Sequence, residues 1–429
     1  MLPLLRFDSF QCGFIPNSQA ANGVYAIKRA AELSREWGTP FFIVQLDLAK
    51  AFDRVLHSAV VDALKLQGAS LQCVAVLCAI LSQSKAAVSL GHLKASLLDL
   101  CRGLPQGAPE SPLIFVLVTE FVLRPLLRKW QSNGDGWKLG NFYLSAICYA
   151  DDILLISSSK ASLTRMLADI VEAFAVVGLD VAAEKCHWTS VPYMTTSTLP
   201  LRDHQLNWES HLTFVGTVLD VGGNDGRAID YRIAQATKVF FKWRSILQCP
   251  NAPLMSRVTL FTKTVLMALL WLSETWYPTK RQRFRLESWC ARMVARVCRL
   301  KRYGDEDMGD YWKRLHRTGR RWLRLCCGGA NVCRRRRLHG FAGHISRAQD
   351  DSIAGRALRT RSLGWWRHFQ KNNLIRHPRR FHPWRWESQL EDFYGQTTAL
   401  FVDEDAGWML LARDRAGWKA REQLFSAAM

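Results

Sequence analysis

Residues 145–157 read SAICYADDILLIS, and this stretch decides the fold. Two short runs of apolar, β-favouring residues flank the acidic pair Asp151-Asp152, which is the pattern of a β-hairpin with carboxylates at its tip. A second apolar run, FFIVQLDL at 41–48, carries Asp47 near its end and predicts a buried strand. An acidic pair in a turn is usually only solvated charge, so its role depends on the motifs around it.

Three acids at strand ends suit a pair of divalent cations. Carboxylates that lie close together repel one another unless a cation neutralises them. Mg²⁺ prefers oxygen ligands and keeps positions open for substrate phosphates. Two such ions, about 3.5–4 Å apart, activate an attacking hydroxyl and stabilise a leaving group. The pattern therefore predicts a metal-dependent phosphoryl-transfer site at Asp47, Asp151 and Asp152.

Three motifs that contain or surround these acids occur in a fixed order. Residues 47–53 read DLAKAFD, residues 102–112 read RGLPQGAPESP, and residues 149–152 read YADD. Together they resemble the palm motifs of reverse transcriptases. The longer form LAKAFDRVLH at 48–57 resembles the branch that contains non-LTR retrotransposons and group II introns.

Shorter blocks extend the resemblance over roughly residues 11–350. They are QCGF at 11–14, Gly178-Leu179 followed by Lys185, Phe214-Val215-Gly216, Glu274-Thr275-Trp276, and Gly343-His344 with Arg347. The last two resemble ETW and GHxxR elements of non-LTR retrotransposons. The resemblance implies an RNA-directed DNA polymerase of a non-LTR retrotransposon, which transfers dNTPs to a primer 3′-OH.

The resemblance also implies an α+β fold in three parts. These are a right-hand polymerase palm with partial fingers at 1–200, a helical thumb at 201–277, and a basic, mostly helical C-terminal region at 278–429. The family's basic finger block ahead of QxGF has no counterpart here, and nothing resembles an endonuclease domain. We therefore expect residues 1–429 alone to polymerise poorly, because the triphosphate is not clamped.

Apolar periodicity and terminal signals predict the helices. The predicted helices are Ala20–Trp37, His57–Leu66, Leu71–Leu81, Pro109–Leu127, Ser162–Val177, one that carries Ile229 to Leu247, and a continuous one that carries Leu254 to Trp276.

Positions that match the family's motifs carry its catalytic roles. The resemblance implies that Asp47 and Asp151 hold two Mg²⁺ ions, with Mn²⁺ as an alternative ion. The Leu48 carbonyl would assist them, and Asp152 would be the third acid. Lys185 would protonate the leaving pyrophosphate as a general acid.

Three other positions match nucleotide-binding residues of the family. Phe52 lies where an aromatic ring beneath the sugar blocks a 2′-OH and so selects deoxynucleotides. Gln106 would contact the incoming nucleotide or the template. Gly107, next to it, helps to form a turn that brings the backbone close to the substrate.

Charge is distributed unevenly along the chain. Residues 1–215 contain 18 basic and 18 acidic residues, so the remainder carries the whole net charge of +21. Phosphate contacts by Lys and Arg give affinity without sequence choice, and affinity then falls as salt rises. The expected partners are an RNA template and a DNA primer or target, with dNTP substrates. The predicted nucleic-acid-binding residues are Arg281, Arg285, Arg292, Arg296, Arg299, Arg334, Arg335, Arg336 and Arg337.

The cysteines and apolar stretches indicate the environment of the chain. No secretory signal is recognisable, and the apolar stretch 265–272 is too short to span a bilayer. We therefore expect reduced thiols, an intracellular location in nucleus or cytoplasm, and no membrane partner. Zinc is disfavoured at the C-terminal Cys/His cluster because no pair within it has the C-x₂₋₄-C spacing typical of structural zinc sites. The residues considered for zinc are Cys326, Cys327, Cys333, His339 and His344.

The sequence alone leaves three alternative functions open. One is a catalytically inactive fragment that binds RNA or DNA only through its basic half. Another is an RNA-dependent RNA polymerase, against which Phe52 and the YADD form argue. The third is a group II intron-type maturase, against which the ETW and GHxxR matches argue.

Overall fold

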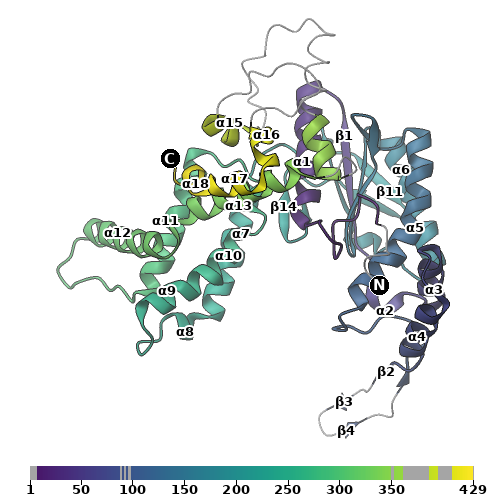
Figure 1. Ribbon diagram of the computed structural model, residues 1–429, viewed down its shortest axis with the longest axis horizontal. Helices are drawn as coiled ribbons and strands as arrows, with labels where there is room; N and C mark the ends of the chain where they lie inside the picture. Colours follow the sequence, from purple (N-terminus) through teal and green to yellow (C-terminus); the bar gives the residue numbers. More distant parts are fainter. Residues whose placement is uncertain are drawn as a thin grey trace, which may run out of the picture. The chain divides into compact units, whose positions relative to one another are not determined.

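The computed structural model describes residues 7–86, 89–90, 93–94, 98–348, 352–360, 386–394 and 408–428. These residues form two compact units. The first contains the described residues up to Val215 together with 352–360, and the second contains the others (Figure 1). Sheet and helix combine in the first unit, which confirms the α+β class.

A four-stranded antiparallel sheet forms the centre of the first unit. Its strand order is β10 (His187–Val191), β1 (Phe41–Leu46), β9 (Asp152–Ser157) and β8 (Ala146–Tyr149). The central strands β1 and β9 are rich in buried Ile, Leu, Val and Phe, as strands covered on both faces require. Strands β8 and β9 form the predicted hairpin.

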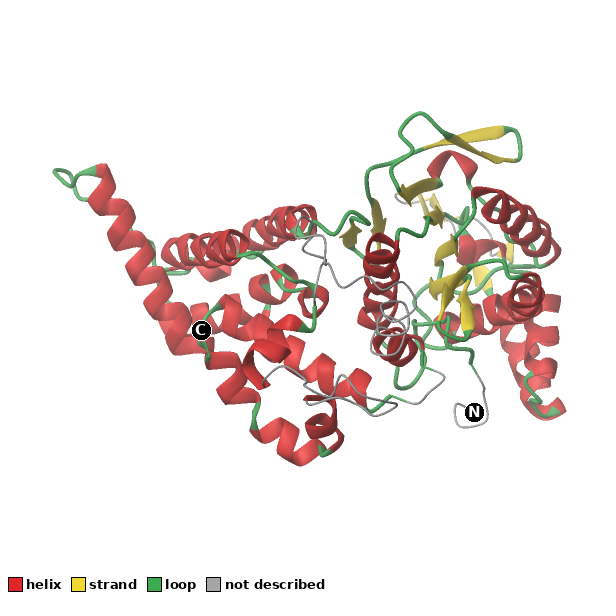
Figure 2. Ribbon diagram, turned by 90° about the horizontal axis from the view of Figure 1, so that it is seen from above, coloured by secondary structure: helices red, strands yellow, loops and turns green. Residues whose placement is uncertain are grey.

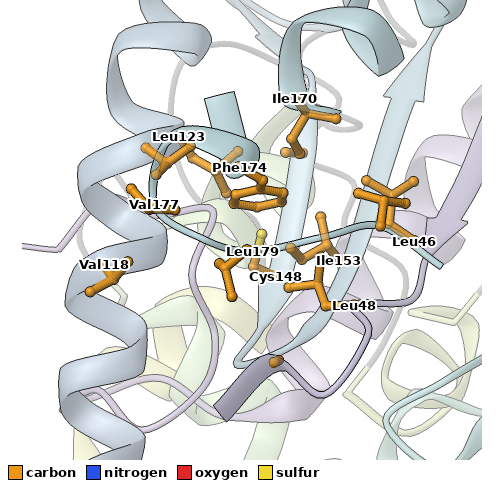
Figure 3. Packing of buried hydrophobic residues seen from close by; sticks show 14 of the residues in the cluster. Leu46, Leu48, Val118, Leu123, Cys148, Ile153, Ile170, Phe174, Val177 and Leu179 are labelled. Atoms are coloured by element: carbon orange, nitrogen blue, oxygen red, sulfur yellow. The ribbon is translucent and has the colours of Figure 1, made fainter. Parts of the chain in front are cut away.

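Helices cover both faces of this sheet. The helix α1 (Ala20–Trp37) has its predicted bounds, and a Cβ at Gly23 would lie 2.8 Å from Ile147, so glycine permits the close approach. The other face packs against α5 (Ser111–Asn133) and α6 (Lys160–Val176). Figure 3 shows Phe174 and Leu123 from these helices among the side chains that pack with Ile153.

Smaller elements complete the first unit. They are α2 (Ala51–Arg54), α3 (His57–Leu66), α4 (Leu71–Ser82), η2 (Ala183–Lys185), β13 (Leu212–Phe214) and the pairs β2 (Lys85–Ala86) with β5 (Leu98–Asp99), β3 (Ser89–Leu90) with β4 (Leu93–Lys94), β6 (Trp137–Leu139) with β7 (Phe142–Leu144), and β11 (Thr198–Leu201) with β12 (His204–Asn207).

The second unit is almost wholly helical (Figure 2). Its elements are β14 (Thr217–Leu219), α7 (Gly226–Lys242), α8 (Arg244–Leu247), α9 (Leu254–Lys263), α10 (Val265–Leu269), η3 (Ser273–Thr275), α11 (Lys280–Val297), α12 (Met308–Cys327), α13 (Ala330–Ser346), α15 (Ser388–Tyr394), α16 (Trp408–Arg413), α17 (Arg415–Ala420) and α18 (Glu422–Ala427). Helices α7 to α12 share one hydrophobic core, so residues predicted as thumb and as C-terminal region pack together here. Among the described residues, no helix is long and apolar enough to cross a membrane.

The continuous helix expected over 254–276 is wrong. The helix is interrupted at Thr264, where φ is −114°, and Leu272 has a left-handed φ of 58°. The reason lies in the ETW segment that follows. Arg337 donates to both carboxylate oxygens of Glu274, at 2.8 and 3.1 Å, and the Trp386 indole donates to its carbonyl at 2.6 Å. These contacts hold the segment in a 3₁₀ turn.

Gly319 allows α12 to cross close to α11. A Cβ at this position would collide with the backbone carbonyl of Ala291, whereas a Cβ at the exposed Gly340 of α13 would meet nothing within 4 Å. Both glycines lie inside helices, so their helix propensities match and only their surroundings differ.

We predict opposite effects of alanine at these two positions. Gly319→Ala should lower the free energy of unfolding by at least about 2 kcal/mol, because backbone must move to relieve the overlap. Gly340→Ala should raise it by about 1 kcal/mol through helix propensity. Urea denaturation followed by circular dichroism measures both, and a neutral or stabilising Gly319→Ala would contradict the packing.

Candidate active site

Strand register brings the predicted acids to one end of the sheet. Leu46 of β1 pairs with Ile153 of β9, so the next position along the antiparallel ladder places Asp47 beside Asp152. Tyr149 pairs with Asp152 across a two-residue turn, in which Ala150 takes a left-handed φ of 56°. Asp151, the second turn residue, is exposed. Two separate segments of the sequence therefore present carboxylates at the same end of the sheet, which we call the carboxylate edge.

The electrostatics of this edge follow from burial and like charge. Burial raises the pKa of Asp152 to about 6, and the neighbouring charges of Asp151 and Asp47 act in the same direction. The Val215 amide donates to Asp152 at 3.3 Å and opposes the shift by stabilising the carboxylate. The three acids thus repel one another, and bound cations would relieve this repulsion.

The donor set is that of a hard cation. Carboxylate oxygens at an open edge suit Mg²⁺, which takes few protein ligands and retains positions for substrate. Within the described residues, however, no three His, Cys, Asp or Glu side chains are already arranged closely enough to hold a metal ion. The residue types therefore fit the predicted ion, although these side chains do not form a closed cage.

A glutamine that the sequence analysis left without a role supports the acidic turn. The Gln11 side-chain oxygen accepts hydrogen bonds from the amides of Gly13, at 2.9 Å, and Ala150, at 3.3 Å. A Cβ at Gly13 would lie 2.9 Å from the Ala150 nitrogen, so only glycine allows this approach. The QCGF block therefore fixes the backbone that carries Asp151. In the sequence, the Gln-x-Gly spacing at 11–13 is the feature that indicates this supporting role.

Lys185 lies at the same edge as the acids. Its Nζ is 4.0 Å from an Asp47 oxygen, and both side chains are substantially exposed. The adjacent Cys186 sulfur accepts a hydrogen bond from the Asp47 amide at 3.5 Å, which ties this segment to the end of β1. An exposed ammonium beside the carboxylates is free to approach a substrate phosphate.

The two motifs predicted to bind the nucleotide lie against each other. Gln106 donates to the Asp53 carboxylate at 3.0 Å, and the Leu104 amide donates to the Phe52 carbonyl at 2.7 Å. The half-buried Phe52 ring stacks on Phe115 of α5, with centroids 4.8 Å apart. The Leu48 side chain is buried in the core. Gly107 is exposed with a φ of 92°, as the predicted turn requires.

The predicted phosphate-binding arginines divide into two groups. Arg281, Arg285 and Arg292 are exposed on α11, and Arg296 and Arg299 are exposed near its C-terminal end. Residues 334–337, by contrast, belong to α13, where Arg334 and Arg335 are only 1% and 8% exposed.

Three of the residues at 334–337 have partners within the second unit, whereas the buried Arg334 has two nitrogens without a hydrogen-bond partner among the described residues. Arg337 forms the ion pair with Glu274, and the Arg335 guanidinium lies over the Phe425 ring at 4.2 Å. Arg336 approaches Glu422 at 3.9 Å. The block therefore holds the second unit together, and we leave it out of the nucleic-acid surface proposed below.

The Cys and His residues considered for zinc have other contacts. The His339 ring stacks on Trp418 at 4.0 Å and shares a 2.8 Å hydrogen bond with the Tyr394 hydroxyl. The Cys333 thiol donates to the Cys327 carbonyl at 3.5 Å. Burial lowers the pKa of His344, and the neighbouring charge of Arg347 acts in the same direction.

Comparison with known proteins identifies the motifs. The family model described as "Reverse transcriptase (RNA-dependent DNA polymerase)" matches residues 3–219. The chain is 28% identical over 182 residues to the Pol polyprotein of the type-2 retrotransposable element R2DM of Drosophila melanogaster, and 31% identical over 153 residues to that of a type-1 element R2 of Popillia japonica. These matches cover 42% and 35% of this chain but only 17% and 21% of those proteins.

A solved structure is also similar. The telomerase of Candida tropicalis, in complex with a fragment of telomeric RNA, aligns with 79% of this chain and 52% of its own, at 11% identity and a TM-score of 0.41.

The Gln11 contacts lead to a test of the turn. Gln11→Leu removes the oxygen that accepts hydrogen bonds from the Gly13 and Ala150 amides, so both amides should exchange hydrogen faster. The free energy of unfolding should fall by about 1–2 kcal/mol. Amide exchange followed by NMR measures this. Gln205→Leu, on the exposed side of β12, is the control and should change neither. Unchanged protection in Gln11→Leu would contradict the assigned role.

Proposed function

The chain belongs to the reverse transcriptase family, and from this premise we propose that it copies RNA into DNA as part of a non-LTR retrotransposon protein. The observation that carries the proposal is the register of β1 with β9. This register places Asp47 beside Asp152, with Asp151 in the adjacent turn. In this proposal residues 1–200 act as the palm and residues 201–277 as the thumb.

The carboxylate edge would hold the metal ions of the reaction. Asp47, Asp151 and the Leu48 carbonyl would bind two Mg²⁺ ions, or Mn²⁺ in their place, with Asp152 as the third acid. When bound, such ions acidify the primer 3′-OH and neutralise charge on the leaving pyrophosphate. The convergence of acids favours this proposal over a fragment that only binds nucleic acid.

Other residues at this edge would position the substrates. The Lys185 ammonium, beside Asp47, would donate a proton to the pyrophosphate as it leaves. The Phe52 ring, held by Phe115, would exclude a sugar with a 2′-OH. Gln106 would exchange its bond with Asp53 for a contact with the nucleotide or the template. Each role uses a group that is at least partly exposed.

The main test is loss of a single carboxylate. Asp151→Asn should reduce primer extension on an RNA template by at least about a hundredfold, because the amide cannot replace the charge that holds the metal. Enzyme is used in excess over primer, since we expect slow extension. Asp203→Asn, in the exposed β11–β12 turn, should extend like the wild type. Absence of product from wild type, or equal product from Asp151→Asn, would contradict the proposal.

A second test concerns the choice of sugar. Phe52→Val should admit ribonucleotides and raise their use relative to deoxynucleotides by about tenfold or more, since the smaller side chain leaves room for a 2′-OH. Phe52→Tyr keeps the ring and should retain discrimination. Single-nucleotide insertion with dNTP and rNTP measures the ratio. Unchanged discrimination in Phe52→Val would refute the assigned role.

A further inference from the structure

A basic groove of about 1150 Å³ lies between α11 and α12. Among the described residues that line it there is no Asp or Glu. The cations in its walls are Arg281, Arg285 and Arg292 of α11, and Lys313, Arg317, Arg320, Arg321 and Arg324 of α12. Only the α11 side was predicted from the sequence. The structure adds the α12 side and makes the two sides one surface.

The groove follows from the way the two helices pack. Their closest approach is at Gly319, where the missing side chain lets α12 rest on the Ala291 backbone. The core below contains Trp289 and Leu323, so the longer Arg side chains are directed to solvent on the outer side. The lining positions 281–292 and 312–325 extend about 17–20 Å along the helix axes, at about 1.5 Å per residue.

Ion pairs among the described residues neutralise only a minority of these charges. Arg285 pairs with Asp230, and Lys313 pairs with Asp310 at 2.9 Å. In the part of the chain that the structure describes, Arg292, Arg317 and Arg321 form no ion pair. Clustered guanidinium groups without acidic partners attract a polyanion.

Exposed apolar side chains interrupt the positive charge. Phe284 is 63% exposed and Trp312 is 43% exposed, and both line the groove. The Arg320 guanidinium lies 5.5 Å from the Phe284 ring centre. Aromatic faces and guanidinium planes in a basic groove are the surfaces on which unpaired bases stack. A duplex, whose bases are already stacked and paired, could use only the charges.

We propose that the α11–α12 groove binds a single-stranded segment of RNA. The choice of RNA rests on the proposed function, because reverse transcriptases copy RNA. Five arginines of the groove neither form an ion pair within the described residues nor lie over Phe284, and each would contact one phosphate: Arg281, Arg292, Arg317, Arg321 and Arg324. Phosphates would contact the unpaired arginines, and one base would stack on Trp312.

Fluorescence anisotropy with a labelled single-stranded RNA tests the proposal, with the whole chain and without primer, dNTP or divalent metal. The plot of log affinity against log salt should have a slope of about −3.5, since each phosphate on a single strand contributes about −0.7. Arg317→Gln/Arg321→Gln should reduce the slope to about −2. Trp312→Ala should weaken binding about tenfold at any salt, and Trp312→Tyr should weaken it much less.

Matched controls separate the groove from general charge. Lys238→Gln/Lys242→Gln removes two exposed charges from α7, and Phe241→Ala removes an exposed ring from the same helix. Neither should change the affinity by more than about twofold, and the slope should stay near about −3.5 in both. Circular dichroism establishes that every variant is folded.

Four results would overturn the proposal. They are equal losses in the α7 controls, duplex RNA bound as tightly as single-stranded RNA, single-stranded DNA bound tenfold more tightly than RNA, and Trp312→Ala without effect. Because no polymerisation is measured, the groove can fail while the Asp151 and Phe52 predictions hold. Conversely, a chain that cannot extend a primer can still show the predicted binding.

Discussion

The antiparallel pairing of β1 with β9 is the constraint on which the candidate site depends. A shift of one residue would turn every side chain of β1 to the opposite face and would move Asp47 away from Asp152. Buried residues on both faces prevent that shift, with α1 against one face and α5 and α6 against the other. The packing of the sheet therefore holds the carboxylates together against their own repulsion. The burial that comes with it raises the pKa of Asp152.

Much of the first unit was predictable because its signals are local. The helix over 20–37, the helix over 57–66 and the hairpin around Asp151 each follow from apolar periodicity bounded by turn residues. The motifs that contain Asp47, Gln106 and Asp151 could be recognised by order and spacing. The support given by Gln11 is indicated only by the Gln-x-Gly spacing at 11–13, because a hydrogen bond between positions 11 and 150 leaves no periodic trace in the sequence.

Arginine was the residue type whose role the sequence could not resolve. A run of four at 334–337 indicates a solvated basic surface, yet two members are buried and a third pairs with Glu274. The continuous helix expected over 254–276 fails for the same reason. Near its expected end, Glu274 accepts hydrogen bonds from Arg337 and Trp386, which are distant in sequence. Helix propensity is too weak to oppose those contacts. A run of charged residues describes only the local composition, whereas the burial of each arginine depends on the residues that it meets in the folded chain.

The two kinds of arginine explain how one unit can be both stable and strongly basic. Guanidinium groups withdrawn from water need acceptors or ring faces, and the half-buried Arg337 and the buried Arg335 find them on Glu274 and Phe425. The buried Arg334 leaves two nitrogens without a partner among the described residues. The contacts of Arg335 and Arg337 hold α13 within the second unit, whereas α11 and α12 expose their cations along the groove between them. Mutual repulsion among exposed cations costs stability, and the close contact at Gly319 offsets it by burying Leu323 and Trp289. A polyanion that entered the groove would remove that repulsion, so binding and stability of this helix pair are physically linked.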